Sequence, residues 1–365
     1  MKIILTLFEN VQCRLEKLKL SDCSITEEGY KALSSALRSN ASHLIELDLT
    51  GNDPGPSGVK QLSDLLQDPN CQLKTLRFLG PAADEGCQYV TGIVGKNPLL
   101  LRELDLSEHK LGDKGVNKIS ALLQDKHCTL NTLILKNNCI TEGGCHVLAA
   151  ALNSNPSNLT ELDLSENKLG NPGMKIILTL FENVECRLEK LKLSDCSISE
   201  EGYKALSSAL RSNPSHLIEL DLTGNDPGPS GVKQLSDLLQ DPNCQLKTLR
   251  FLGPAADEGC QYVTGIVGKN PLLLRELNLS NHELEDTNMK RLAALLQDKH
   301  CTLNTLTLCG CSITEKQCFI LTSALKSNPS HLRELDLSEN KLQDRGVKIL
   351  CDVLKDSHCK LERLR

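Results

Sequence analysis

A single hydrophobic pattern recurs along the whole chain. The stretch Leu-x-x-Leu-x-Leu begins at Leu15 and returns eleven times, with phenylalanine as its last residue at Phe78 and Phe251. The last full copy begins at Leu332 and a shortened one at Leu361. The copies are 29 residues apart, except for 28 residues after Leu73 and after Leu246. A fixed period of this length is typical of a solenoid, in which each unit buries its apolar face only against its neighbours.

Each unit predicts one short strand followed by one helix. The leucines of the repeated stretch alternate with polar residues, as in a half-buried strand. A Gly-led stretch with helical spacing follows, for example with Leu33, Ala36 and Leu37 on one face. Stacked units of this kind predict an α/β solenoid shaped like a horseshoe, with a parallel β-sheet on the concave face and α-helices on the convex face.

Most units carry a small polar or thiol residue at one further position, just after the strand. Such a side chain can satisfy backbone groups where the chain turns off the strand. The residues that lie eight positions after the first leucine are Asn52, Asn138, Asn167, Asn225, Asn340, Cys23, Cys196 and Cys311.

A larger repeat lies over the first. Residues 1–107 align with 174–280 with four differences, which indicates a recent duplication of a six-unit block or an assembly error that mimics one. One domain of about twelve units therefore spans 1–365. We expect it to be a fragment truncated at both ends, because Met1 aligns with Met174 inside a predicted helix and the last residues stop within a strand.

Composition narrows the possible functions. Hydrophobic residues make up 39% of the chain but aromatic residues only 2%, so we expect an aliphatic core. The net charge of −6 argues against a nucleic-acid partner. No apolar run approaches the roughly 20 residues of a membrane span, so we expect no membrane partner. The N-terminal MKIILTLFEN is not interpreted as a signal segment, because it recurs at 174–183 within the array.

The 17 cysteines follow the repeat and do not predict disulfides. Seven of them form a column in alternate units: Cys13, Cys71, Cys128, Cys186, Cys244, Cys301 and Cys359. Neighbouring strands lie about 4.8 Å apart, so alternate units are at least roughly 9.6 Å apart. A disulfide needs Cα atoms within about 7 Å. We therefore expect free thiols in the core and a reducing, cytoplasmic location.

Three other patterns resemble chemical sites but are better explained structurally. Gly92-x-x-Gly95-Lys96-Asn97 lacks the Ser or Thr that follows the lysine of a phosphate-binding loop. His127-Cys128 places its thiol in the buried column, and Cys309, Cys311 and Cys318 lack paired C-x-x-C spacing. We therefore predict no catalytic residue, no metal site and no cofactor.

The repeats resemble a known family. LRELDLSENKL, LTELDLSENKL and LNTLILKNNCI, each before a helix, resemble the ribonuclease-inhibitor class of leucine-rich repeats. More narrowly, SDCSITEEGYKALSSALRSN is similar to the repeat array of fish NOD-like receptors. That family carries the array as its C-terminal sensor region, behind an effector domain and a NACHT ATPase. The resemblance implies a non-enzymatic sensor in cytoplasmic innate immunity. It implies only this sensor role and not the roles of the effector and ATPase domains.

The concave sheet is the predicted ligand-binding surface. Acidic strands alternate with basic or neutral ones, so opposite charges stand about 4.8 Å apart. A self-neutralising surface is the alternative interpretation. The candidate residues are Lys17, Lys19, Glu46, Asp48, Arg77, Glu103, Asp105, Lys136, Glu161, Asp163, Lys190, Lys192, Glu219, Asp221, Arg250, Glu276, Glu334 and Asp336.

Few anchors for tight binding lie among these residues. Tyr30, Tyr203 and Phe319 fall on predicted helices, and tight interfaces usually centre on Trp, Tyr or Arg.

We predict an interaction module whose partner is a protein ligand or the receptor's own ATPase domain, with the oligomeric state open. The alternative is a stand-alone inhibitor of the ribonuclease-inhibitor type that binds and blocks an enzyme.

Overall fold

The computed structural model describes most of the chain. The described residues are 13–39, 43–66, 68, 70–77, 101–108, 110–155, 158–212, 216–239, 241, 243–250, 275–280, 284, 286–297, 301, 303–327, 332–355 and 359–365. The chain forms two compact units, one of Met1–Leu169 with Asn183–Leu188 and one of Gly170–Glu182 with Glu189–Arg365.

The first unit alternates strands and helices as the repeat predicts. Its strands are β1 (Lys17–Lys19), β2 (Glu46–Asp48), β3 (Thr75–Arg77), β4 (Glu103–Asp105), β5 (Thr132–Ile134) and β6 (Glu161–Asp163). Its helices are α2 (Glu27–Ser39), α3 (Gly55–Leu66), α5 (Gly112–Gln124) and α6 (Glu142–Ser154). Each strand pairs in parallel with the next one in sequence.

The second unit repeats this order. Its strands are β7 (Lys190–Lys192), β8 (Glu219–Asp221), β9 (Thr248–Arg250), β10 (Glu276–Asn278), β11 (Thr305–Thr307), β12 (Glu334–Asp336) and β13 (Arg363–Leu364), again parallel neighbours in sequence order. Its helices are α7 (Gly170–Leu178), the 3-10 helix η1 (Thr179–Glu182), α8 (Glu200–Ser212), α9 (Gly228–Leu239), α11 (Asp286–Gln297), α12 (Glu315–Ser327) and α13 (Gln343–Leu354).

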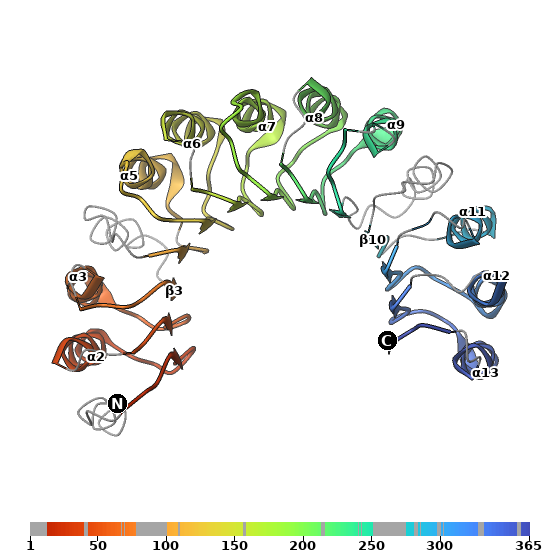
Figure 1. The fold of residues 1–365 in the computed structure, drawn as a ribbon, viewed down its shortest axis with the longest axis horizontal. Helices are drawn as coiled ribbons and strands as arrows, with labels where there is room; N and C mark the ends of the chain where they lie inside the picture. Colours follow the sequence, from red (N-terminus) through yellow and green to blue (C-terminus); the bar gives the residue numbers. More distant parts are fainter. Residues whose placement is uncertain are drawn as a thin grey trace. The chain divides into compact units, whose positions relative to one another are not determined.

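Within each unit, the strands line the inner side and the helices the outer side (Figure 1). The α/β solenoid predicted from the leucine pattern is therefore confirmed. The repeat helix predicted over 174–183 is α-helical only as far as Leu178, and it continues as the 3-10 helix η1. No described helix is long and apolar enough to cross a membrane.

The core lies between sheet and helices and is mainly leucine. The central residue of each strand points toward the helices, and Leu47, Leu76 and Leu104 are fully buried there. Tyr30 and Tyr203 are also fully buried beneath their helices, and each hydroxyl donates to a leucine carbonyl at 3.4 Å. The prediction of an aliphatic core is therefore largely correct. The two tyrosines are aromatic residues that the helices contribute to this core.

Asparagine side chains join consecutive repeats where the chain leaves each strand. The amide of Asn167 donates to the carbonyls of Leu164 at 2.8 Å and of Leu135, in the preceding repeat, at 2.9 Å. Its Oδ1 accepts the backbone N–H groups of Asn138 at 2.9 Å and Ile140 at 3.0 Å. Because Asn167 is 1% exposed, these groups would otherwise be buried without partners.

The same position recurs through both units. Asn52, Asn138, Asn225 and Asn340 donate to the preceding repeat at 2.7 Å in each case. Where cysteine replaces asparagine, the thiol can still donate: Cys311 Sγ lies 2.9 Å from the carbonyl of Leu279. The predicted role of this position is confirmed.

Replacing Asn167 tests this connection between repeats. Asn167→Ala leaves buried N–H and carbonyl groups without partners, so the free energy of unfolding should fall by about 1–3 kcal/mol. Asn167→Cys restores one donor, as at Cys311, and should lose less stability. Urea titration followed by circular dichroism measures both variants. Equal losses for Ala and Cys would contradict the hydrogen-bonding role and would point to lost packing instead.

Candidate functional site

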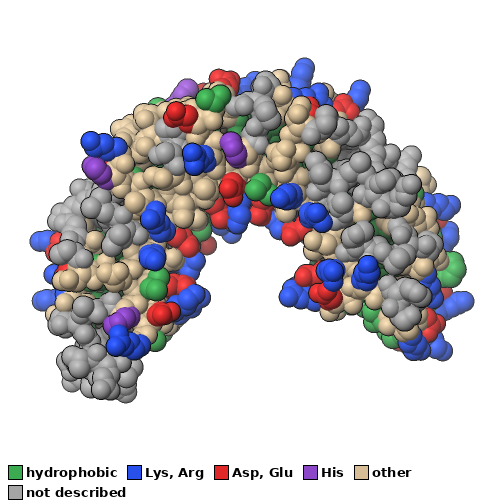
Figure 2. Space-filling view, in the orientation of Figure 1, with side chains coloured by type: hydrophobic (Ala, Val, Ile, Leu, Met, Phe, Trp, Pro, Cys, Tyr) green, Lys and Arg blue, Asp and Glu red, His purple; other side chains and the backbone are tan. Residues whose placement is uncertain are grey.

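One face of the sheet in each unit carries polar side chains and is not covered by helices. Parallel sheets are usually buried on both faces, so an open parallel sheet is itself a candidate binding surface. Charged side chains gather along the strand side of each unit (Figure 2). They come from the first and third residues of the strands, because successive side chains point to opposite faces.

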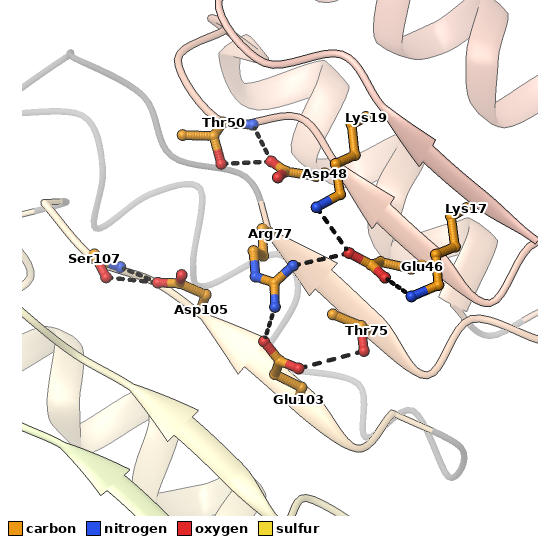
Figure 3. Close-up of polar contacts among 10 residues, drawn as sticks. All are labelled: Lys17, Lys19, Glu46, Asp48, Thr50, Thr75, Arg77, Glu103, Asp105 and Ser107. Carbon is orange, nitrogen blue, oxygen red and sulfur yellow. Dashed lines mark hydrogen bonds and ion pairs between the residues drawn. The ribbon is translucent and has the colours of Figure 1, made fainter. Parts of the chain in front are cut away.

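Arg77 on β3 lies between two carboxylates from neighbouring strands (Figure 3). Its Nη1 is 3.1 Å from Glu46 Oε1 on β2, and its Nη2 contacts Glu103 on β4. The hydroxyl of Thr75 also reaches Glu103, at 3.5 Å. The Arg77 side chain is 27% exposed. The guanidinium therefore joins three strands while keeping one edge accessible.

Glu46 is surrounded by three cations. Besides Arg77, Lys17 Nζ lies 3.0 Å from Glu46 Oε2, and Lys19 Nζ lies 3.6 Å from Oε1. The lysine side chains are 69% and 62% exposed, whereas that of Glu46 is 14% exposed. The hydrogen bond from Lys17, aided by the charges of both lysines and by Arg77, lowers the pKa of Glu46 against the opposing effect of its burial.

The duplicated block builds the same arrangement in the second unit. Arg250 Nη1 lies 2.6 Å from Glu219 Oε1, and its Nη2 lies 2.8 Å from Glu276 Oε2. A simpler pair follows on the last strands, where Arg363 lies 3.1 Å from Glu334. We call the groups around Arg77 and Arg250 the two arginine clamps.

The aspartates of the predicted site have a structural role that the sequence interpretation missed. Asp48 Oδ1 accepts the backbone N–H of Thr50 at 3.0 Å and its hydroxyl at 2.6 Å. Asp105, Asp163, Asp221 and Asp336 accept the N–H two residues later in the same way. The recurring Asp-x-Ser/Thr spacing is the signal that would have revealed these turns.

The remaining predicted residues are divided between the two units. Lys136 lies just beyond β5 and pairs with Glu166 at 2.8 Å, an acidic partner that was not among the candidates. The hydrogen bond with Glu166 raises the pKa of Lys136. Glu161 lies on β6 in the first unit, whereas Lys190 and Lys192 lie on β7 in the second.

The prediction of buried core thiols is correct for three members of the column, holds in part for the other four, and is wrong for three residues outside it. All 15 described cysteines are free; Cys128, Cys244 and Cys301 are buried, and the other column members are half-buried. Cys23, Cys139 and Cys351 are exposed, contrary to the prediction of core thiols. Cys139 faces solvent because its neighbours Asn138 and Ile140 occupy the inward positions of the turn.

The other motifs that resemble chemical sites have structural explanations wherever they lie among the described residues. Burial raises the pKa of the Cys128 thiol, and His127 beside it is exposed. Cys311 donates to a backbone carbonyl, and the described residues contain no group of three His, Cys, Asp or Glu placed to hold a metal ion. The Gly92–Asn97 motif and its copy at 265–270 lie outside the described residues.

Comparison with known proteins agrees with this geometry. The family described as "Leucine Rich repeat" matches residues 12–34, 40–63, 99–120, 155–177, 213–236 and 328–351. The chain is an array of leucine-rich repeats. It is 34% identical over 358 residues to the ribonuclease inhibitor of Sus scrofa, covering 97% of the chain and 64% of that protein.

The leucine-rich-repeat array also has relatives among larger proteins. It is 41% identical over 128 residues to NACHT, LRR and PYD domains-containing protein 12 of Homo sapiens, covering 35% of the chain and 12% of that protein. The Mus musculus protein of the same name is 35% identical over 364 residues, covering 98% of the chain and 23% of that protein. The chain thus spans less than two thirds of the length of these relatives.

The charge environment of Glu46 can be tested by titration. Its lowered pKa means that its ion pairs stabilise the fold above the ordinary glutamate pKa of about 4.3, and that this stabilisation is lost as the pH falls through the lower folded-state pKa. Lys17→Met should move the Glu46 pKa upward. Carboxyl-carbon NMR titration of wild type and variant measures the shift, and an unchanged pKa would refute the role of Lys17.

Thiol labelling tests the placement of the cysteines. Burial raises the pKa of Cys128 and Cys244, so less thiolate is present near neutral pH and alkylation should be slow. The exposed Cys23, Cys139 and Cys351 should react first. Iodoacetamide labelling of the native chain followed by peptide mass spectrometry measures the order. Early labelling of Cys128 would show that the column is accessible.

Proposed function

We propose that the array is a non-enzymatic protein-interaction module, acting as the sensor region of a NACHT-containing innate immune receptor. The observation that carries this proposal is the open, charged sheet face with its two arginine clamps. The similarity to NACHT, LRR and PYD domains-containing proteins supports the receptor assignment. A cytoplasmic location is part of the proposal, and the free state of all described cysteines supports it.

The proposed mechanism is a shift of a conformational equilibrium. A ligand, or the receptor's own ATPase domain, contacts the array and binds one state of the receptor better than the other. The arginine clamps are well placed for reversible binding of a partner. Their ion pairs keep the side chains ordered, and the exposed part of each arginine is left to contact the partner. Since most charges on this face already have partners, we expect the contact to give specificity more than very high affinity.

A second candidate is a stand-alone enzyme inhibitor of the ribonuclease-inhibitor type. It is supported by the similarity to the Sus scrofa inhibitor across 97% of this chain. The binding of a basic enzyme would require accessible carboxylates. Glu46, Glu103, Glu219 and Glu276 are instead held by arginines, and the aspartates bond to their own turns. We therefore favour the receptor assignment.

Paired arginine variants test the proposed surface. Arg77→Ala combined with Arg250→Ala removes both clamps and should abolish capture of the specific cellular partners of the array. The matched control is Arg38→Ala combined with Arg211→Ala. These two arginines occupy the same position in the last turns of the duplicated helices α2 and α8, away from the sheet. Affinity capture with quantitative mass spectrometry compares them. If the clamp variant keeps every partner that the control keeps, the sheet face is not the binding surface.

An inhibition assay separates the two candidate functions. The receptor assignment predicts no inhibition of a pancreatic-type ribonuclease by the purified array. Nanomolar inhibition that is kept or strengthened in the clamp variant, whose glutamates are no longer held by arginines, would reverse our ranking and support the inhibitor.

A further inference from the structure

One position on the outer side of the helices is occupied by a basic residue in most repeats. This position follows a residue that is buried in most of the helices, such as Tyr30 and Cys318, although Val347 on α13 is exposed. The side chain at the position itself is exposed in every described helix. In chain order the described residues at this position are Lys31, Lys60, Asn117, His146, Lys175, Lys204, Lys233, Lys290, Phe319 and Lys348. Phe319 on α12 is the apolar exception.

Phe319 is unusually exposed for an aromatic residue. It is 61% exposed, although its neighbours Cys318, Leu321 and Thr322 are buried. A phenylalanine left in water forfeits the stabilisation that burial of its ring would bring. The repeat shows that the fold does not require an apolar residue there, because nine of the ten described equivalents are polar.

The flanking helices place lysines on both sides of Phe319. Lys290 on α11 and Lys348 on α13 occupy the same position of the preceding and following repeats. Packed helices have axes about 8–10 Å apart, so the three side chains form a short row. Hydrophobic surface lies between Lys and Arg side chains on the outer side of α11–α13 (Figure 2).

The acidic residues nearby are mostly engaged with other cations. Lys316 pairs with Asp286, Arg345 pairs with Glu315 at 2.9 Å, and Lys355 pairs with Asp352 at 3.3 Å. Among the residues that the structure describes, Lys290, Lys326 and Lys348 form no ion pair. Asp344, one turn before Lys348, is the remaining free carboxylate of α13. The row thus offers one apolar anchor and an excess of unpaired positive charge.

We propose that the outer face of α11–α13, centred on Phe319, binds an acidic protein segment that carries an apolar side chain. The apolar side chain packs on Phe319, and its acidic neighbours meet Lys290 and Lys348. A single-stranded nucleic acid fits less well, because such binders present several stacking aromatics along a continuous basic groove and this chain is acidic overall, at −6. The surface is independent of the sheet face and of the function proposed for it.

Selection from a displayed library of random peptides tests this surface. The Phe319→Lys variant installs the residue that most equivalent positions already have, so its melting temperature should equal that of the wild type. Panning against the wild type, with Phe319→Lys as the counter-selection, should enrich peptides that combine acidic and apolar residues. Their affinity should fall by about tenfold or more in Phe319→Lys and should weaken in high salt.

A gain-of-function variant provides the second arm. Lys204→Phe on α8 places a phenylalanine between Lys175 on α7 and Lys233 on α9 and recreates the row at a new place. Introduced into the Phe319→Lys background, it should restore measurable binding of the selected peptides. This binding should be weaker than in the wild type, because Lys175 lies 3.8 Å from Glu201.

Three outcomes would overturn the proposal. The first is that wild type and Phe319→Lys enrich the same peptides. The second is enrichment of basic or uncharged apolar peptides, which would exclude an acidic partner. The third is that a labelled polyuridine strand or a phosphatidylserine vesicle binds the wild type more tightly than the selected peptides, with the same loss in Phe319→Lys. That result would assign the surface to a nucleic acid or a membrane.

Discussion

The structure depends on the satisfaction of buried backbone groups where each repeat turns off its strand. A side chain from one repeat, such as Asn167, accepts two N–H groups and donates to a carbonyl of the repeat before it. No single repeat can bury its leucines alone, so this hydrogen bonding and the leucine stacking act together. At Cys311 a thiol takes the same place and donates to the carbonyl of Leu279 in the preceding repeat. The regular strand spacing that results is what brings side chains of successive strands into register.

The arginine clamps are a consequence of that register. Because Arg77 on β3 stands directly beside Asp48 and Asp105 along the sheet, its long side chain reaches the glutamates on both neighbouring strands. These pairs are partly buried, and pairs at a protein surface each contribute at most about 1 kcal/mol. Their main effect is to order the side chains on an open face. Arg250 reproduces the arrangement within the second unit, so a repeated partner could use both copies.

Much of the fold and part of the site could be predicted from the sequence. The leucine spacing located every described strand, and the Asn/Cys position was interpreted correctly because its role depends only on backbone geometry. The turn role of the aspartates was missed, since the hydrogen bond of Asp48 to its own turn depends on the side-chain torsion. Phe319 was placed on a helix, but only the packing of α12 between α11 and α13 shows that it is exposed. Periodicity determines which face a residue occupies, whereas its contacts depend on its three-dimensional neighbours.

Lysine footprinting in living cells tests the central claim, that the open sheet face is the surface occupied by a partner. The chain would be labelled with a permeant amine-reactive reagent in cells, and again as purified protein. The account predicts that Lys17, Lys19 and the duplicate Lys190 are protected in cells, while Lys31 and Lys204 on the helices label equally in both samples. Equal labelling of the sheet lysines in cells and in the purified chain would contradict it.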